Sequence, residues 1–95
     1  MKVVFEEEAE WQLYDLADII DDLNLVGAGG RWINRLLSFI ESFAKSNVSY
    51  ALCRDKRLAK KKYSCISYKH KWIIAFKIVE DEMRVYEIIH GSILK

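Results

Sequence analysis

The chain has 95 residues, 52% of them hydrophobic and 31% charged, which predicts one globular domain over residues 1–95 and excludes a disordered chain. Its longest uninterrupted apolar run, residues 72–76, is too short to cross a bilayer, and its acidic start lacks the hydrophobic stretch of an export signal, so we expect a cytoplasmic protein without membrane contact. The formal net charge of +1 conceals an asymmetry, because residues 1–26 sum to −7 and the remainder to +8, and this predicts a basic working face and an acidic opposite face.

The first half of the chain has the pattern of a short strand followed by two helices. Residues 2–5 are rich in β-forming side chains. Over residues 6–23 the apolar side chains recur every three or four positions, which predicts an amphipathic helix. The glycine-rich stretch NLVGAGG, residues 24–30, is expected to be the connector, and a second helical pattern covers about residues 32–45. The two helices are therefore expected to form an αα-hairpin.

The second half has the composition of three strands. Residues 63–68, 72–79 and 83–90 are rich in β-branched and aromatic residues. The polar breaks KHK (69–71) and EDE (80–82) have the length of hairpin turns, so the three runs predict an antiparallel meander. The predicted order is β-α-α-β-β-β, an α+β fold in which a helical hairpin packs on one side of a small twisted, mainly antiparallel sheet.

A strongly basic segment, RDKRLAKKK at residues 54–62, precedes these strands and has a net charge of +5. Basic groups beside an aromatic ring suit a phosphate backbone with a stacked base. A solvated loop that only keeps the protein soluble has the same composition, and an acidic protein partner also fits the charge. The candidate nucleic-acid-binding residues are Arg54, Lys56, Arg57, Lys60, Lys61, Lys62 and Tyr63.

The stretch RVYEIIHGS, residues 84–92, ends an apolar strand pattern at a histidine. Alternation along the strand would place Arg84, Tyr86 and His90 on one face, unless a bulge changes it, and there the three could orient a phosphate and move a proton. Lys71, in the polar break before the middle strand, could add positive charge to the same face as the basic segment of residues 54–62. The alternative is structural, with His90 marking only where the strand leaves the core and Arg84 an edge cation. The catalytic candidates are thus His90, Arg84 and Lys71.

Cysteine usage gives a second expectation about chemistry. Cys53 and Cys65 are the only cysteines, and without a sign of export they are expected to be reduced thiols that pack in the interior. Two cysteines and two histidines lack the paired spacing of a zinc site, so we expect neither a metal nor another cofactor.

The order of elements, together with the ending KWIIAFKIVEDEMRVYEIIHGS, resembles the RelE/ParE superfamily, the toxins of bacterial type II toxin–antitoxin systems. The resemblance covers nearly the whole chain, and its most specific part is the last hairpin, which ends in Ile-Ile-His-Gly at residues 88–91. It implies a cognate antitoxin as protein partner. RelE-like members cleave mRNA in the ribosomal A site without metal, by attack of a ribose 2′-hydroxyl on the adjacent phosphate, whereas ParE-like members inhibit DNA gyrase.

The resemblance also implies roles for particular residues. His90 matches the histidine common at the end of the family's last strand, and the cations of residues 54–62 fall where RelE-like members keep RNA-binding side chains. In the nuclease reading these cations and Lys71 hold phosphate, His90 acts as general acid or base, and Arg84 stabilises developing charge. Trp72 stands near the place where many members have an arginine, and no terminal tyrosine follows the histidine. Three readings stay open: an mRNA endoribonuclease, a gyrase inhibitor, and a non-toxic antitoxin-binding member.

Overall fold

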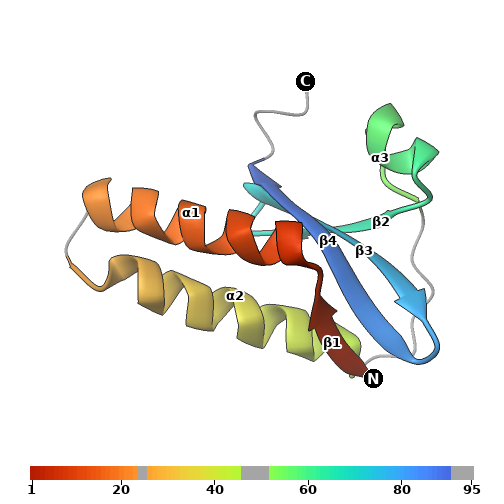
Figure 1. Cartoon of the computed structure of the whole chain (residues 1–95), viewed down its shortest axis with the longest axis horizontal. Helices are drawn as coiled ribbons and strands as arrows, with labels where there is room; N and C mark the ends of the chain where they lie inside the picture. The colour runs from red at the N-terminus through yellow and green to blue at the C-terminus, as the bar shows by residue number, and fades with distance from the viewer. Residues whose placement is uncertain (24–25, 46–51, 91–95) are drawn as a thin grey trace.

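The computed structural model describes residues 1–23, 26–45 and 52–90. The predicted order β-α-α-β-β-β is confirmed, with one short helix, α3, added before the second strand (Figure 1). The elements are β1 Lys2–Phe5, α1 Glu7–Leu23, α2 Ala28–Ala44, α3 Lys56–Lys60, β2 Ser64–Tyr68, β3 Trp72–Val79 and β4 Glu82–His90. Within the described ranges no helix is both long and apolar enough to cross a membrane.

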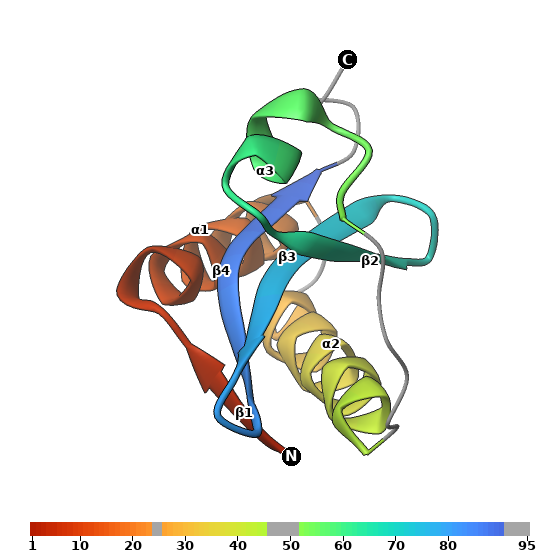
Figure 2. The ribbon, with the colours of Figure 1, turned by 90° about the vertical axis from the view of Figure 1, so that its right-hand side faces the viewer.

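The four strands form one mixed sheet in the order β1-β4-β3-β2 (Figure 2). Strand β1 runs parallel to β4, and the other neighbouring strands are antiparallel. Both predicted hairpin turns are confirmed. Val79 pairs with Glu82, so Glu80 and Asp81 form a two-residue turn in which both have positive φ, as type I′ requires. Tyr68 pairs with Trp72, so the other connection has three residues, of which Lys69 and His70 have positive φ. The meander is therefore as expected, and β1 adds a parallel edge strand to it.

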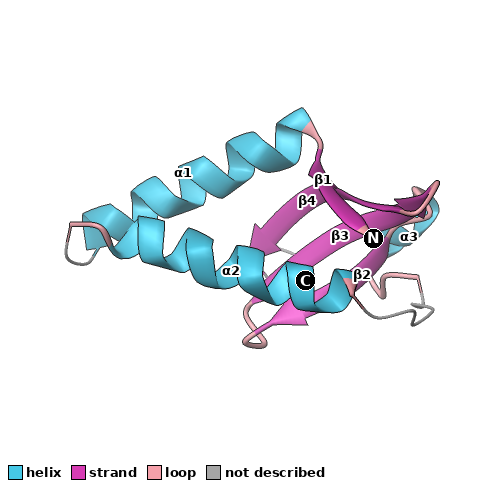
Figure 3. Cartoon of the chain, turned by 90° about the horizontal axis from the view of Figure 1, so that it is seen from below, coloured by secondary structure: helices cyan, strands magenta, loops and turns pink. Residues whose placement is uncertain are grey.

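Helices α1 and α2 cover one face of the sheet, and α3 lies against the other face (Figures 2 and 3). The larger core lies between the sheet and the two long helices, and its most deeply buried members include Leu36, Ile40, Ile74, Phe76, Met83 and Val85. A smaller cluster lies under α3, where Ala75 and Ile89 of the sheet pack against Leu58. Each face of the central strands thus buries its own set of apolar side chains. This explains why the residues of β3 that point to either face of the sheet are mostly apolar.

The connector between α1 and α2 is shorter than expected, because α2 already includes residues 28–30 of the stretch NLVGAGG. Gly29 explains the difference: a Cβ at this position would lie 2.2 Å from the carbonyl oxygen of Ala17 in α1. Its amide donates a hydrogen bond of 2.8 Å to Oδ1 of Asp21. The glycine is therefore a close contact between two helices, while residues 24–25 of the expected connector lie outside the described part of the chain.

Helix α3 is held against the sheet by a disulfide between Cys53 and Cys65. The expectation of two reduced thiols is wrong, because the fold brings these residues to a Cα–Cα distance of 4.9 Å, within the range that a disulfide needs. Asp55 caps the helix by accepting a hydrogen bond of 3.1 Å from the amide of Leu58, a fully buried residue. A five-residue helix is not stable alone, so these contacts are what hold its basic side chains in place.

Candidate functional site

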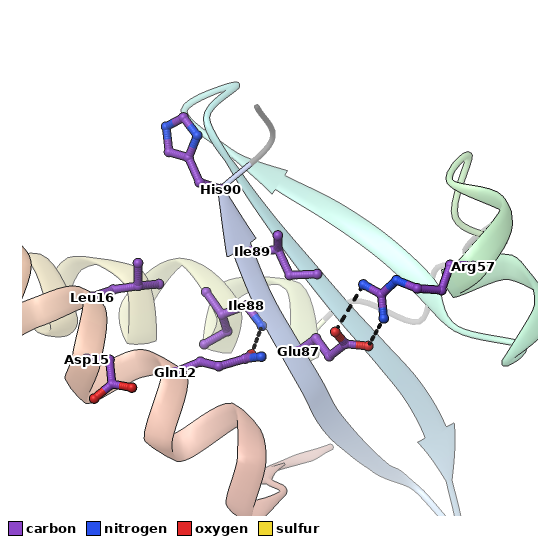
Figure 4. Close-up of a pocket in the computed structure, with 8 residues that line it drawn as sticks. All are labelled: Gln12, Asp15, Leu16, Arg57, Glu87, Ile88, Ile89 and His90. Atoms are coloured by element: carbon purple, nitrogen blue, oxygen red, sulfur yellow. Dashed lines mark hydrogen bonds and ion pairs between the residues drawn. The ribbon is translucent and has the colours of Figure 1, made fainter. Parts of the chain in front are cut away.

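A pocket of about 350 Å³ surrounds the outer edge of β4 near the end of the strand (Figure 4). Its lining residues are Gln12, Asp15, Leu16, Arg57, Glu87, Ile88, Ile89 and His90. The edge is open here because β1 pairs only with residues 82–85, so α1 forms one wall and α3 reaches in from the other side. Two predicted site residues, His90 and Arg57, line this pocket from opposite faces of the sheet, because His90 has the parity of Ile88, which faces α1 and α2, while Arg57 reaches in from α3. Among the described residues, no group of three or more His, Cys, Asp or Glu could hold a metal ion.

His90, the last residue of β4, is one of the residues that line the pocket. It pairs with Trp72 at the start of β3, and the two rings meet edge to face with centroids 5.0 Å apart. The ring of Trp72 also contacts Trp32, and the centroids of these two rings lie 5.0 Å apart. Lys71, an exposed turn residue, immediately precedes Trp72 and therefore lies at the same end of the sheet. An imidazole held in this way can serve as an acid–base group.

Glu87 organises the cations on the α3 side of the pocket. It is mostly buried, and its carboxylate accepts two hydrogen bonds from Arg57, of 3.2 and 3.3 Å. Nζ of Lys61 lies 3.9 Å from the same carboxylate. The hydrogen bond to Glu87, followed by Coulombic attraction, raises the pKa of the Arg57 guanidinium above its ordinary value. Two predicted phosphate-binding cations are thus positioned by a carboxylate that also offsets part of their charge.

The wall formed by α1 is tied to the open strand edge by Gln12. Its Oε1 accepts a hydrogen bond of 2.8 Å from the amide of Ile88, which satisfies a donor that an unpaired strand edge would otherwise present. Asp15 lies further along the same helix, lines the pocket and is exposed. The pocket therefore carries carboxylates as well as cations.

The expectation that Arg84 and His90 share one face of the strand is wrong. Strand β4 has a bulge at Tyr86, because the residues on either side of Tyr86 pair with successive residues of β3. One extra residue reverses the alternation of side chains along the rest of the strand. Val85 before the bulge and Ile88 after it both face the core under α1 and α2. Arg84 and His90 therefore point to opposite faces of the sheet.

Arg84 is also occupied by two carboxylates at the far end of β4. Its guanidinium donates to Glu6 at 3.2 Å and to Glu82 at 3.1 Å. The hydrogen bond to Glu82 is the largest cause that raises the pKa of Arg84 above its ordinary value. The geometry thus separates this catalytic candidate from the pocket in both position and charge.

The other residues of the basic segment surround α3 on the opposite side of the sheet from α1 and α2. Four of them have exposed side chains: Arg54, Lys56, Lys60 and Lys62. Tyr63 is partly buried and stacks on Tyr86 with centroids 4.8 Å apart. Burial, followed by the nearby charge of Glu87, raises the pKa of the Tyr63 hydroxyl. Exposure of the four cations leaves them accessible to a phosphate backbone, and their binding role stays a prediction.

Several residues of this region were not recognised from the sequence, namely Gln12, Asp15, Lys77 and Glu87. Glu87 could have been recognised, because it is a single acidic residue inside the apolar run of the last strand. Such a residue needs a cation or hydrogen-bond donors when it is buried. Gln12 and Asp15 had none, since polar residues on an amphipathic helix are ordinarily solvated.

Comparison of the chain with models of protein families finds no family that matches it. Comparison with curated protein sequences likewise finds no significant match.

Proposed function

We propose that this chain is a toxin of the RelE/ParE type from a bacterial type II toxin–antitoxin system, and that it is a ribosome-dependent, metal-independent mRNA endoribonuclease of the cytoplasm. The observation that carries the proposal is a pocket that is lined by both His90 and Arg57, beside an exposed basic segment. The resemblance of the β-α-α-β-β-β order supports it. The partners are a cognate antitoxin, the ribosome and mRNA, and no cofactor takes part.

In this proposal the ribose 2′-hydroxyl of the mRNA attacks the adjacent phosphate, and the 5′-oxygen of the next nucleotide leaves. His90 accepts the proton of the 2′-hydroxyl or protonates the leaving oxygen. Arg57 takes the charge-stabilising role that the sequence suggested for Arg84, and it shares its donors between Glu87 and the phosphate. Lys71 and the exposed cations around α3 hold the neighbouring backbone.

A ParE-like inhibitor of DNA gyrase is the second candidate, and the pairing of both guanidiniums favours it. Arg84 is bound by Glu6 and Glu82, and Arg57 is bound by Glu87. Paired guanidiniums stabilise a phosphorane less than unpaired ones, whereas a protein that only docks on gyrase does not need that stabilisation. A non-toxic member that binds an antitoxin is the third reading.

Two activities of the purified chain separate these readings. A defined mRNA is translated by bacterial ribosomes with the protein present, and relaxed plasmid is supplied to DNA gyrase in a parallel reaction. The nuclease proposal expects mRNA cleavage that requires ribosomes and leaves supercoiling intact. Blocked supercoiling without cleavage would establish the gyrase reading, and inactivity in both reactions, with normal growth of expressing cells, would leave only the non-toxic reading.

A further inference from the structure

The α3 face of the sheet carries side chains to which the proposed reaction gives no role. On β3, Ala75 packs with Leu58 of α3, so Lys77, two residues later, points to the same face. Tyr86, the bulge residue of β4, meets Tyr63 there. Side chains from β3, from β4 and from the segment after α3 therefore converge on one area outside the pocket.

This area is a pair of stacked rings bordered by ammonium groups. The rings of Tyr63 and Tyr86 have centroids 4.8 Å apart and planes inclined by 19°. Nζ of Lys77 lies 5.4 Å from the Tyr63 centroid and 5.7 Å from the Tyr86 centroid. Nζ of Lys61 lies 6.0 Å from the Tyr63 centroid. Both rings are only partly buried, and we refer to Tyr63, Tyr86 and Lys77 as the tyrosine platform.

The charge of the platform is positive where Lys77 lies. Within the described part of the chain no ion pair joins Lys77 to a carboxylate, whereas Lys61 lies 3.9 Å from Glu87. Arg84, which pairs with Lys77 across the β3–β4 ladder, is bound by Glu6 and Glu82 and adds no net positive charge there. An ammonium group that lies over aromatic rings and lacks a counter-ion can bind a phosphate while the rings bind a base.

We propose that the tyrosine platform binds one unpaired nucleotide, whose base stacks on a tyrosine ring while Lys77 contacts its phosphate. The inference rests on the proposed function, to which it adds a binding place for the strand outside the pocket. Every base has a π-face, so stacking accepts any sequence, but it requires an unpaired base. RNA and DNA share this chemistry, and they therefore form separate arms of the test.

Binding is measured by fluorescence anisotropy with short labelled oligonucleotides, offered as single-stranded RNA, single-stranded DNA and duplex, at several salt concentrations. Tyr86→Leu removes a ring and keeps an apolar side chain, and Lys77→Met removes the charge and keeps the length. Lys69→Met is the matched control, because Nζ of Lys69 lies 5.4 Å from the ring centroid of Tyr68. It deletes the same kind of cation from the β2–β3 turn, away from the platform.

The platform predicts that single strands bind more tightly than duplex and that Tyr86→Leu weakens this binding about tenfold, the effect of one lost base stack. Tyr86→Phe keeps the ring and retains binding. Lys77→Met lowers the affinity and reduces the slope of log K against log salt by about 0.7, the contribution of one phosphate contact. Equal losses in Lys69→Met and Lys77→Met, or duplex bound as tightly as single strands, would overturn the proposal.

Melting temperatures show whether each variant is folded. If Tyr86→Leu is unfolded, the comparison of nucleotide binding between Lys77→Met and Lys69→Met tests the proposal without it. Ribosome-dependent cleavage is measured separately on the same variants. Cleavage by the wild-type chain without single-strand binding would overturn the platform and leave the proposed function standing. Platform-dependent binding without any cleavage would support the platform and remove the nuclease function on which it was built.

Discussion

Glu87 connects the pocket at the end of β4 with the tyrosine platform. Its mostly buried carboxylate accepts both hydrogen bonds from Arg57, lies 3.9 Å from Lys61, and acts electrostatically on Tyr63. A carboxylate in this position fixes where the cations of α3 stand, and it limits the positive charge that they present. One acidic residue inside an apolar strand thus sets the electrostatics of the α3 side of the sheet.

The tyrosine hydroxyl beside Glu87 gives a pH-dependent prediction. Burial and, secondarily, Glu87 raise the pKa of Tyr63 above its ordinary value, so between that value and the raised one the folded chain keeps a proton that the unfolded chain loses. The free energy of unfolding therefore falls as the pH rises through this alkaline window. In a phenolate absorbance titration, Tyr63→Phe should remove a transition that lies above the ordinary tyrosine range.

Glu87→Gln provides the control for this titration. It should move the Tyr63 transition only partly toward the ordinary value, because burial is the larger cause and remains. If Tyr63→Phe instead removed a phenol that titrates in the ordinary range, the result would contradict the partial burial of Tyr63 and its closeness to the negative charge of Glu87.

How far the site could be predicted differs between its residues. His90 was recognisable because an apolar strand pattern stops at it, and in the structure it lines the pocket. The separation of Arg84 from His90 was not recognisable, since it depends on one extra residue at Tyr86 in the ladder with β3. Such a bulge is set by the pairing of two strands, and the local order of side chains does not reveal it.

The helical hairpin depends on the close approach of the α1 and α2 backbones at one glycine. A Cβ at Gly29 would lie 2.2 Å from the carbonyl oxygen of Ala17, whereas nothing lies within 4 Å of the corresponding position at Gly30. Both glycines belong to the first turn of α2. They therefore form a matched pair in which only the contact between α1 and α2 differs.

Gly29→Ala should destabilise the fold by about 1–3 kcal/mol, because the two helix backbones must move apart. Gly30→Ala should stabilise it by up to about 1 kcal/mol, since alanine favours the helix and restricts the unfolded chain. Urea denaturation of both variants measures these changes. Equal effects of the two substitutions would show that α1 and α2 do not meet at Gly29.

The disulfide between Cys53 and Cys65 should stabilise the chain through a closed segment of 12 positions. Reduction is expected to lower the free energy of unfolding by roughly 2–4 kcal/mol and to increase hydrogen exchange of the amides in residues 52–63. The Cys53→Ala/Cys65→Ala double variant lacks the bond, so it should have this reduced stability whether or not reductant is present. A wild-type chain that is insensitive to reductant would contradict the bond.

The long elements were predictable from their periodicity, and the short ones were not. Residues 7–23 and 28–44 repeat every three or four positions, and 72–79 and 82–90 are long β-rich runs broken by turn-forming residues. Helix α3 has five residues, too few for a period, and is formed by its Asp55 cap, by burial of Leu58 and by a disulfide. These contacts are tertiary, and the sequence of the basic segment therefore did not predict a helix there.

At the scale of the whole molecule, the two charged regions meet at the pocket. Helix α1 carries seven acidic residues and no basic one, and its Asp15 lines the same pocket as Arg57 of α3. A negatively charged strand is repelled from α1 and attracted to the cations around α3. In the proposed function, RNA therefore approaches along the α3 side and reaches His90 around the open edge of β4.

The most direct test is cleavage of a defined mRNA on bacterial ribosomes by matched histidine variants, in chelator-treated buffer with magnesium limited to what ribosomes need. His90 lies in the pocket, and His70 is an exposed turn residue whose positive φ asparagine tolerates. We expect His90→Asn to lose cleavage by about 10²-fold or more and His70→Asn to retain it, with products that end in a 2′,3′-cyclic phosphate and a 5′-hydroxyl. Equal activity of the two variants, or products with 5′-phosphates, would contradict the role of His90 in 2′-hydroxyl attack.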